Sequence, residues 1–210
     1  MLALVMPMLV SGVAEASGTT PTKKTAKKTD SEEGKVLFQK VYNMIFGTQG
    51  SSFGYEVNIA GLYKTKGFVA YHGKKQYYDD SHATVWEDGV TSYQFSKKKK
   101  VVNIYSCNDP ERNKWMNKFK FEPDKFTYSC KTEGEFYILS ARLKKHSMFG
   151  LREIVGKVYK KNLYPVSMTA KLPLIQAVVT ITNFHSGVTD DAIFVYPREK
   201  YKSYEVIDNR

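Results

Sequence analysis

Residues Thr84–Phe95 read TVWEDGVTSYQF, in which Asp88-Gly89 separates two runs rich in aromatic and β-branched residues. Such runs favour strands, and an Asp-Gly pair suits a two-residue hairpin because both positions tolerate positive φ angles. The stretch therefore predicts a β-hairpin. A second turn at Ser96–Lys99 is predicted to send Lys100–Tyr105 back beside its partner, with the lysines keeping the turn soluble and unpaired.

Alternation with a period of two continues on both sides of this hairpin. Tyr55, Val57 and Ile59 alternate with Glu56, Asn58 and Ala60, as in a half-buried strand. Further strands are predicted at Phe126–Lys131, Phe136–Lys144, Ile154–Lys160, Pro165–Leu172 and Ala177–Phe184. The segment Asn108–Asn117 is polar and irregular, with room for one short helix.

One amphipathic helix is predicted before the strands, from about residue 32 to residue 46. Its apolar residues share one face: Val36, Leu37, Val41, Met44 and Ile45. Ser31 is a suitable N-cap and Gly47 a suitable stop.

The order of elements, one helix followed by about ten antiparallel strands with short turns, indicates a mainly β (α+β) fold. A strongly curved sheet or open barrel fits this order best. The inner face of such a sheet must be filled by side chains, plugged by a helix or occupied by a ligand.

The N-terminus has the features of an export signal. Residues Met1–Val13 are apolar and uncharged, and Ala14-Glu15-Ala16 has the small-x-small form of a cleavage site. The apolar run is too short for a membrane span, which needs about 20 residues. We therefore expect a signal peptide at 1–16, a disordered basic linker at 17–30 and one domain at 31–210. No cysteine follows the cleavage site, so we expect a soluble periplasmic protein without a lipid anchor.

The chain is basic, with 32 Lys and Arg against 21 Asp and Glu. The part after residue 30 keeps 28 basic against 19 acidic residues. Such a charge attracts anionic lipid headgroups or nucleic acid, although a solvated basic face is the simpler explanation. Lysines and aromatics interleave at Lys74–Tyr78, but the expected export argues against a nucleic-acid partner.

Two cysteines, Cys107 and Cys130, favour one disulfide in an oxidising compartment, the alternative being two small buried thiols. They are too few for a metal site, and the histidines lie far from them in sequence: His72, His82, His146 and His185. We expect neither a metal nor another cofactor.

No set of residues recommends catalysis. Asp79, Asp80 and His82 lie close together, as do Glu87 and Asp88, but acidic residues near turns are usually solvated caps. The chain lacks the Gly-x-Ser-x-Gly, His-Glu-x-x-His and glycine-rich phosphate-loop motifs. We therefore expect a protein that is not an enzyme.

Three local features together resemble the LolA-like lipoprotein carrier family. The first is the Asp-Gly hairpin within Trp86–Tyr93, and the second is the strand that begins at Lys100-Val101. The third is Phe194–Pro197 followed by a chain end of Asp208-Asn209-Arg210. The resemblance implies an unclosed antiparallel half-barrel whose concave face is lidded by helices and shields lipoprotein acyl chains in transit across the periplasm.

The resemblance also implies partners, and this chain differs from the family at one place. An inner-membrane exporter would load this monomeric carrier with acylated lipoproteins, and an outer-membrane acceptor would unload it. Members have an Arg-Pro that ties the lid to the barrel, whereas this chain has Tyr71–Lys75 at that place. Lys74 and His72 are the available substitutes, but neither reproduces the planar fork of an arginine.

Strand and helix patterns supply the lining expected for such a cavity, with ordinary core as the alternative role. The lipid-binding set is Val57, Ile59, Phe68, Trp86, Tyr93, Met168, Val179 and Ile181, and Val41 and Ile45 belong to the lid. Two other classes of function stay open: an envelope module with the same half-barrel that senses lipid or lipoprotein, and an envelope enzyme.

Overall fold

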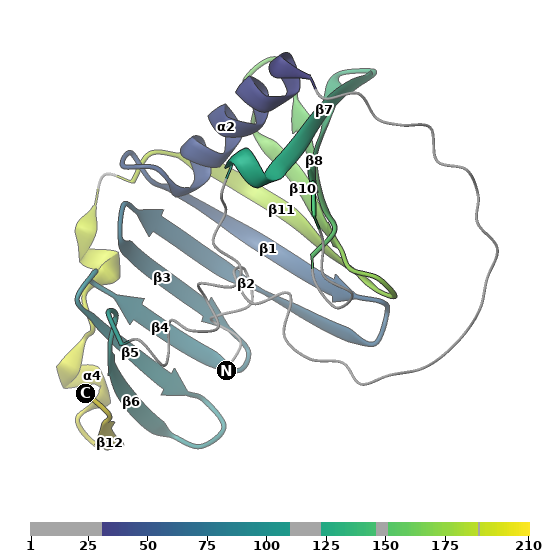
Figure 1. The fold of residues 1–210 in the computed structure, drawn as a ribbon. Coiled ribbons are helices and arrows are strands. Elements are labelled where there is room, and N and C mark those ends of the chain that lie inside the picture. Colours follow the sequence, from purple (N-terminus) through teal and green to yellow (C-terminus); the bar gives the residue numbers. More distant parts are fainter. Residues whose placement is uncertain (1–30, 110–122, 146–150, 189) are drawn as a thin grey trace.

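A single twelve-stranded sheet forms the body of the chain (Figure 1). The structure, a computed structural model, describes residues 31–109, 123–145, 151–188 and 190–210. The expected signal peptide and linker, and most of the irregular segment Asn108–Asn117, lie outside these ranges. The helices are α2 (Glu32–Phe46), η1 (Pro123–Lys125), η2 (Asp191–Phe194) and α4 (Arg198–Tyr201). The strands are β1 (Ser51–Ile59), β2 (Tyr63–His72), β3 (Lys75–Asp80), β4 (Ala83–Glu87), β5 (Thr91–Ser96), β6 (Val101–Ser106), β7 (Phe126–Glu133), β8 (Phe136–Leu143), β9 (Glu153–Tyr159), β10 (Pro165–Lys171), β11 (Gln176–Ser186) and β12 (Glu205–Asp208).

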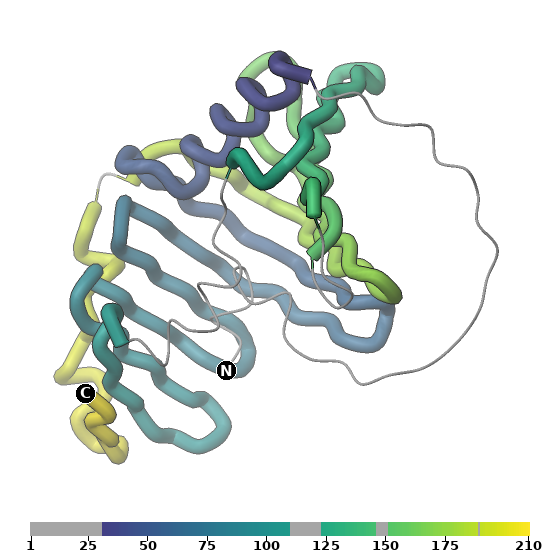
Figure 2. Tube along the Cα trace, viewed as in Figure 1, coloured from purple at the N-terminus to yellow at the C-terminus, as the bar shows by residue number. Residues whose placement is uncertain are grey.

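Two meanders, β1 to β6 and β7 to β11, make up the sheet together with β12, and they meet where β1 pairs with β11. The strand order is β12-β6-β5-β4-β3-β2-β1-β11-β10-β9-β8-β7, antiparallel throughout except that β12 runs parallel to β6. The tube in Figure 2 shows the two meanders standing at a steep angle to each other, with α2 across the opening. The predicted mainly β, unclosed fold is confirmed. The strands β2, β3 and β12 complete the predicted set.

Helix α2 has the bounds that its sequence predicts. The Ser31 side chain accepts a hydrogen bond from Gly34 N at 3.0 Å, which caps the first turn. Glu32 and Glu33 follow, where negative charge interacts favourably with the helix dipole. Gly47 lies at the C-terminal cap and hydrogen-bonds to Asn43 O. The prediction of one N-terminal helix is confirmed.

The Asp-Gly turn differs in detail from its prediction. Glu87 pairs with Ser92, and Asp88 N donates to Thr91 O at 3.2 Å, so the two residues at the tip are Gly89 and Val90 rather than Asp88 and Gly89. Only Gly89 has a positive φ, of 95°. Asp88 acts through its side chain instead, because its Oδ1 accepts hydrogen bonds from Val90 N at 2.8 Å and Thr91 N at 2.7 Å.

The pairing register divides the strand residues between a concave and a convex face. Tyr55 and Val57 of β1 pair with Ile181 and Val179 of β11, and they form one buried cluster with Ile45 of α2. The face that α2 covers is the concave face. A second cluster, made by Trp86, Phe95 and Val102 with Tyr201 of α4, lies on the opposite, convex face.

The predicted disulfide is wrong. Cys107 and Cys130 are both half-buried thiols that are not joined to each other. Cys107 directly follows β6 and Cys130 lies in β7, and these strands stand near opposite ends of the sheet order. A disulfide requires Cα atoms within about 7 Å, and ten strand-to-strand steps separate the two positions. Burial is the main reason that the pKa of the Cys130 thiol is raised.

A buried carboxylate, Asp80, fixes the turn between β3 and β4. Its Oδ1 accepts hydrogen bonds from His82 N at 2.7 Å and Ala83 N at 2.8 Å. Its Oδ2 accepts from Tyr78 Oη at 2.7 Å and Thr65 Oγ1 at 3.2 Å. Burial alone would raise the pKa of Asp80, but these hydrogen bonds outweigh it and lower the pKa. Asp80 therefore has a structural role.

We expect Asp80→Ala to lower the free energy of unfolding by about 1–3 kcal/mol, because it leaves buried donors without an acceptor. Urea unfolding followed by circular dichroism measures the change. The matched control is Asp79→Ala, which removes a more exposed carboxylate and should cost less. Because the pKa of Asp80 is lowered, its contribution is present at neutral pH and is lost as the pH falls through that pKa. Equal losses for the two variants would contradict the structural role.

Candidate functional site

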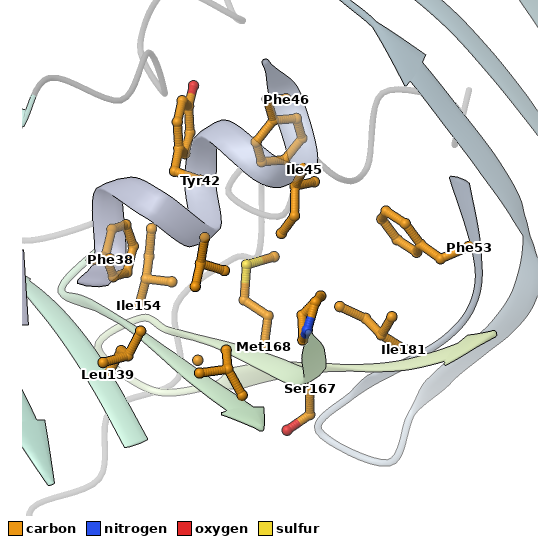
Figure 3. A pocket seen from close by; sticks show the side chains of 14 residues that line it. Phe38, Tyr42, Ile45, Phe46, Phe53, Leu139, Ile154, Ser167, Met168 and Ile181 are labelled. Carbon is orange, nitrogen blue, oxygen red and sulfur yellow. The ribbon is translucent and has the colours of Figure 1, made fainter. Parts of the chain in front are cut away.

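An apolar cavity lies between α2 and the concave face of the sheet (Figure 3). Helix α2, the start of β1, and β8 to β11 supply its walls. The lining residues are Phe38, Val41, Tyr42, Ile45, Phe46, Phe53, Leu139, Ile154, Gly156, Val158, Pro165, Ser167, Met168 and Ile181. The cavity thus spans the place where the two meanders join.

The roof of the cavity is one face of α2. The contributing residues are Phe38, Val41, Tyr42, Ile45 and Phe46, whose spacings of three, one, three and one keep them on one side of a helix. Figure 3 labels four of these side chains along the helix: Phe38, Tyr42, Ile45 and Phe46. The sequence pattern that predicted the helix therefore also determines which face roofs the cavity.

The floor has a hollow at Gly156 of β9. Gly156 lies between Met168 of β10 and Leu139 of β8, with which it is paired in register. A Cβ atom added at Gly156 would meet no atom within 4 Å. The missing side chain therefore leaves open space between two larger neighbours.

Polar groups contribute almost nothing to this surface. Among the described lining residues, only Tyr42 and Ser167 supply side-chain hydroxyls, and Figure 3 shows both hydroxyls directed away from the centre of the cavity. Burial raises the pKa of Tyr42, so its hydroxyl stays protonated at neutral pH. The part of the lining that the structure describes has no charged side chain and suits an apolar ligand.

In this closed form the cavity is small. It holds about 60 Å³ of space open to a water-sized molecule. Sites for drug-sized ligands usually measure about 300–1,000 Å³, so a long chain can enter only if α2 or its side chains move outward.

Contacts at both ends hold α2 against the sheet. Ser31 N donates to Tyr128 O of β7 at 2.9 Å, and Ser51 Oγ donates to Ile45 O at 2.8 Å. Between them, Gly34 packs so closely on β7 that an added Cβ would come within 2.9 Å of the Ser129 carbonyl carbon. The N-terminal turn of α2 is therefore fixed by direct contact of two backbones.

The structure brings some of the predicted binding residues together and separates others. Val41, Ile45, Met168 and Ile181 line the cavity. Val57, Ile59 and Val179 lie on the same face, within or against the neighbouring core.

Three residues that the sequence predicted to line the cavity lie instead on the convex face: Phe68, Trp86 and Tyr93. Trp86 and Tyr93 pack against Tyr196, with ring centroids 5.4 and 4.5 Å away. Phe68 is 36% exposed and pairs in register with Asp79. Because several of these strands are apolar on both faces, alternation alone did not distinguish the concave side.

His72 and Lys74 do not take the place of a lid arginine in the described contacts. His72 Nδ1 lies 2.6 Å from Asp191 Oδ1, and Lys75 Nζ lies 2.5 Å from Asp191 Oδ2. These contacts tie β2 and β3 to η2 rather than to α2. Lys74 lies beside the Asp-Gly turn, close to Gly89.

Several lining residues were missed in the sequence, notably Phe38 and Phe46 of α2 and Gly156 of β9. The helical spacing of Phe38, Val41 and Ile45 could have revealed the first. A glycine amid the alternating residues Ile154 and Val158 is the signal that could have revealed the hollow.

The comparisons with known proteins concern the fold. No family model matches the chain, and no curated protein matches it in sequence. An uncharacterized conserved protein from Thermus thermophilus matches in structure with a TM-score of 0.55 at 9% identity, over 85% of this chain and 100% of that one. A LolA superfamily protein from Nitrosomonas europaea scores 0.38 at 10% identity, over 78% and 97%. The Mycobacterium tuberculosis lipoprotein LppX scores 0.45 at 8% identity, over 77% and 100%.

At such identities these matches concern architecture alone, and the half-barrel implied by the sequence resemblance is present as a fold. In the described ranges, no helix is long and apolar enough to cross a membrane. The same ranges hold no group of three or more His, Cys, Asp or Glu side chains placed to bind a metal ion.

We expect Gly34→Val to push α2 away from β7, because the new side chain meets backbone rather than a flexible side chain. The free energy of unfolding should fall by about 1–3 kcal/mol, as for other overpacked sites. An apolar fluorescent dye should bind the variant more strongly once the cavity opens. Lys40→Ala, on the exposed side of α2, is the control for both measurements. Unchanged stability and dye binding in Gly34→Val would contradict the close backbone contact.

Proposed function

We propose that this chain is a periplasmic carrier that shields the acyl chains of lipoproteins in the cavity beneath α2 and ferries them from the inner to the outer membrane. The observation that carries the proposal is the lining of the cavity, which is almost wholly apolar and has no charged group among the described residues. The half-barrel architecture agrees with the resemblance to lipoprotein carriers in the sequence.

The free energy of exposing an acyl chain to water explains why a lipid ligand needs such a cavity. An acyl chain of about fifteen methylenes costs roughly 12 kcal/mol to expose to water, at about 0.8 kcal/mol per methylene. A carrier must therefore bury most of the chain. The strands β8 to β11 offer an apolar floor for such a chain once α2 moves outward.

Loading exchanges one apolar contact for another. When α2 moves outward, Phe38, Val41 and Ile45 leave the sheet, and an acyl chain covers the floor in their place. The net cost of opening is thereby reduced, because the floor never faces water. Met168 at the centre of the floor has a flexible side chain that adapts to either partner.

Release requires no chemistry of its own. An inner-membrane exporter would load the carrier, and an outer-membrane acceptor of higher affinity would unload it, by passive transfer without a cofactor. This direction of transfer follows from the affinities of the two partners alone. We propose the monomer as the working unit.

The test of the cavity is Gly156→Leu. The Cβ atom of the new side chain meets no atom within 4 Å and the rest of it occupies the floor of the cavity, so the fold should be kept. We expect the affinity for a fluorescent fatty-acid probe to fall at least about tenfold, because apolar volume is no longer free for the ligand. Fluorescence titration measures the affinity, and thermal unfolding checks the fold.

Thr169→Leu is the matched control, since residue 169 is adjacent to Met168 in β10 and therefore points to the opposite face. It should bind the probe like the unmodified protein. Normal binding by Gly156→Leu would overturn the cavity assignment. Transfer of a labelled lipoprotein to acceptor membranes then separates a carrier from a sensor, which would retain its ligand.

A further inference from the structure

Two turns at one end of the sheet expose leucines to solvent. Leu62, in the turn between β1 and β2, is 93% exposed, and Leu174, in the turn between β10 and β11, is 73% exposed. Large apolar side chains at such exposure usually mark a contact with a partner when they occur together.

The two turns are neighbours. Ile59 and Ala177 pair at the ends of β1 and β11, and Ala60 N donates to Gln176 O at 3.2 Å. Leu62 and Leu174 therefore project from adjacent hairpin tips, far in sequence but side by side in the fold. Figure 1 shows these hairpin ends together at one side of the sheet.

Basic residues lie along the same end of the sheet as the leucine tips. We name the turns at this end of the sheet the basic rim. Adjacent turns contact each other, as where Lys97 N donates to His82 O at 2.9 Å. Their exposed basic residues are Lys64, Lys98, Lys99, Lys100, Lys125, Lys144, Lys145 and Arg152. The described residues at this end include two exposed acidic ones, Asp124 and Glu205, the latter at the start of β12 opposite Val101.

The opposite end of the sheet has a different charge pattern. Its described turns and the adjoining η2 carry exposed acidic residues: Asp88, Glu133, Glu135, Asp190 and Asp191. Exposed lysines such as Lys74 and Lys161 balance them. The excess positive charge of the fold is thus concentrated at the end that also exposes the leucines.

We propose that the basic rim docks on an anionic lipid surface, with Leu62 and Leu174 inserted at the boundary of headgroups and acyl chains. Apolar tips enter this boundary while neighbouring lysines stay at the level of the negative headgroups. Each lysine near such a surface strengthens binding about fivefold. The docking does not rest on the ligand cavity, which lies under α2 on the concave face.

A nucleic acid or an acidic protein explains the lysines less completely. Phosphates and carboxylates attract the charges but give no reason for leucines that protrude singly from two turns. A lipid surface accounts for both features at once, because it offers negative charge and an apolar interior in the same plane.

The experiment is flotation of the full chain with vesicles of phosphatidylcholine, with and without about 30% phosphatidylglycerol, a proportion that gives a strong negative surface potential. We expect binding to the anionic vesicles that weakens with salt. The double variant Leu62→Ser/Leu174→Ser should bind at least about tenfold more weakly, since two apolar anchors are lost. Lys98→Glu/Lys99→Glu should also weaken binding to the anionic vesicles.

The matched control is Val90→Ser/Val195→Ser, which removes two other exposed apolar side chains that lie away from the basic rim. It should bind vesicles like the unmodified protein, as should the cavity-filling variant Gly156→Leu. The proposal fails if the unmodified protein ignores anionic vesicles, or if loss of the leucines has no effect. Leucine-dependent binding to polyglutamate without vesicle binding would indicate an acidic protein partner and overturn it too.

Discussion

The pairing of β1 with β11 is the contact on which the rest of the structure depends. Each meander forms from strands that follow one another in sequence, and among the described strands this pair alone joins the two. Helix α2 runs directly into β1, so the position of its apolar face over β8 to β11 follows from that pairing. The cavity exists because a local hairpin architecture is closed by one contact between distant parts of the chain.

The sheet buries apolar side chains on both faces, and a different segment covers each. On the concave face, α2 bridges the bend between the meanders and leaves a small gap beneath it. On the convex face, aromatic rings of the C-terminal segment pack directly against Trp86 and Phe95. A roof that is a single helix can move as a unit, whereas a layer of interlocked rings cannot do so without breaking many contacts.

Local patterns in the sequence predicted the helix, the Asp-Gly hairpin and most strands, because each depends on residues close together in the chain. Local patterns could not predict which face of each strand is concave. Residues Ala83–Trp86 are all buried, so alternation gives no contrast between Val85 on one side and Trp86 on the other. The disulfide prediction failed for a related reason, since compartment and cysteine count contain no information on strand order.

The convex face is covered only when the C-terminal segment of the chain is in place. Strand β12 reaches β6 in parallel only after the chain has passed from β11 along η2 and α4, and Tyr201 and Tyr204 lie in the last part of that path. A chain without this segment in place therefore leaves Trp86 and Phe95 without the rings of Tyr201 and Tyr204 against them. A truncated product would display the same aromatic surface permanently, which gives chaperones and proteases a physical mark of incomplete synthesis.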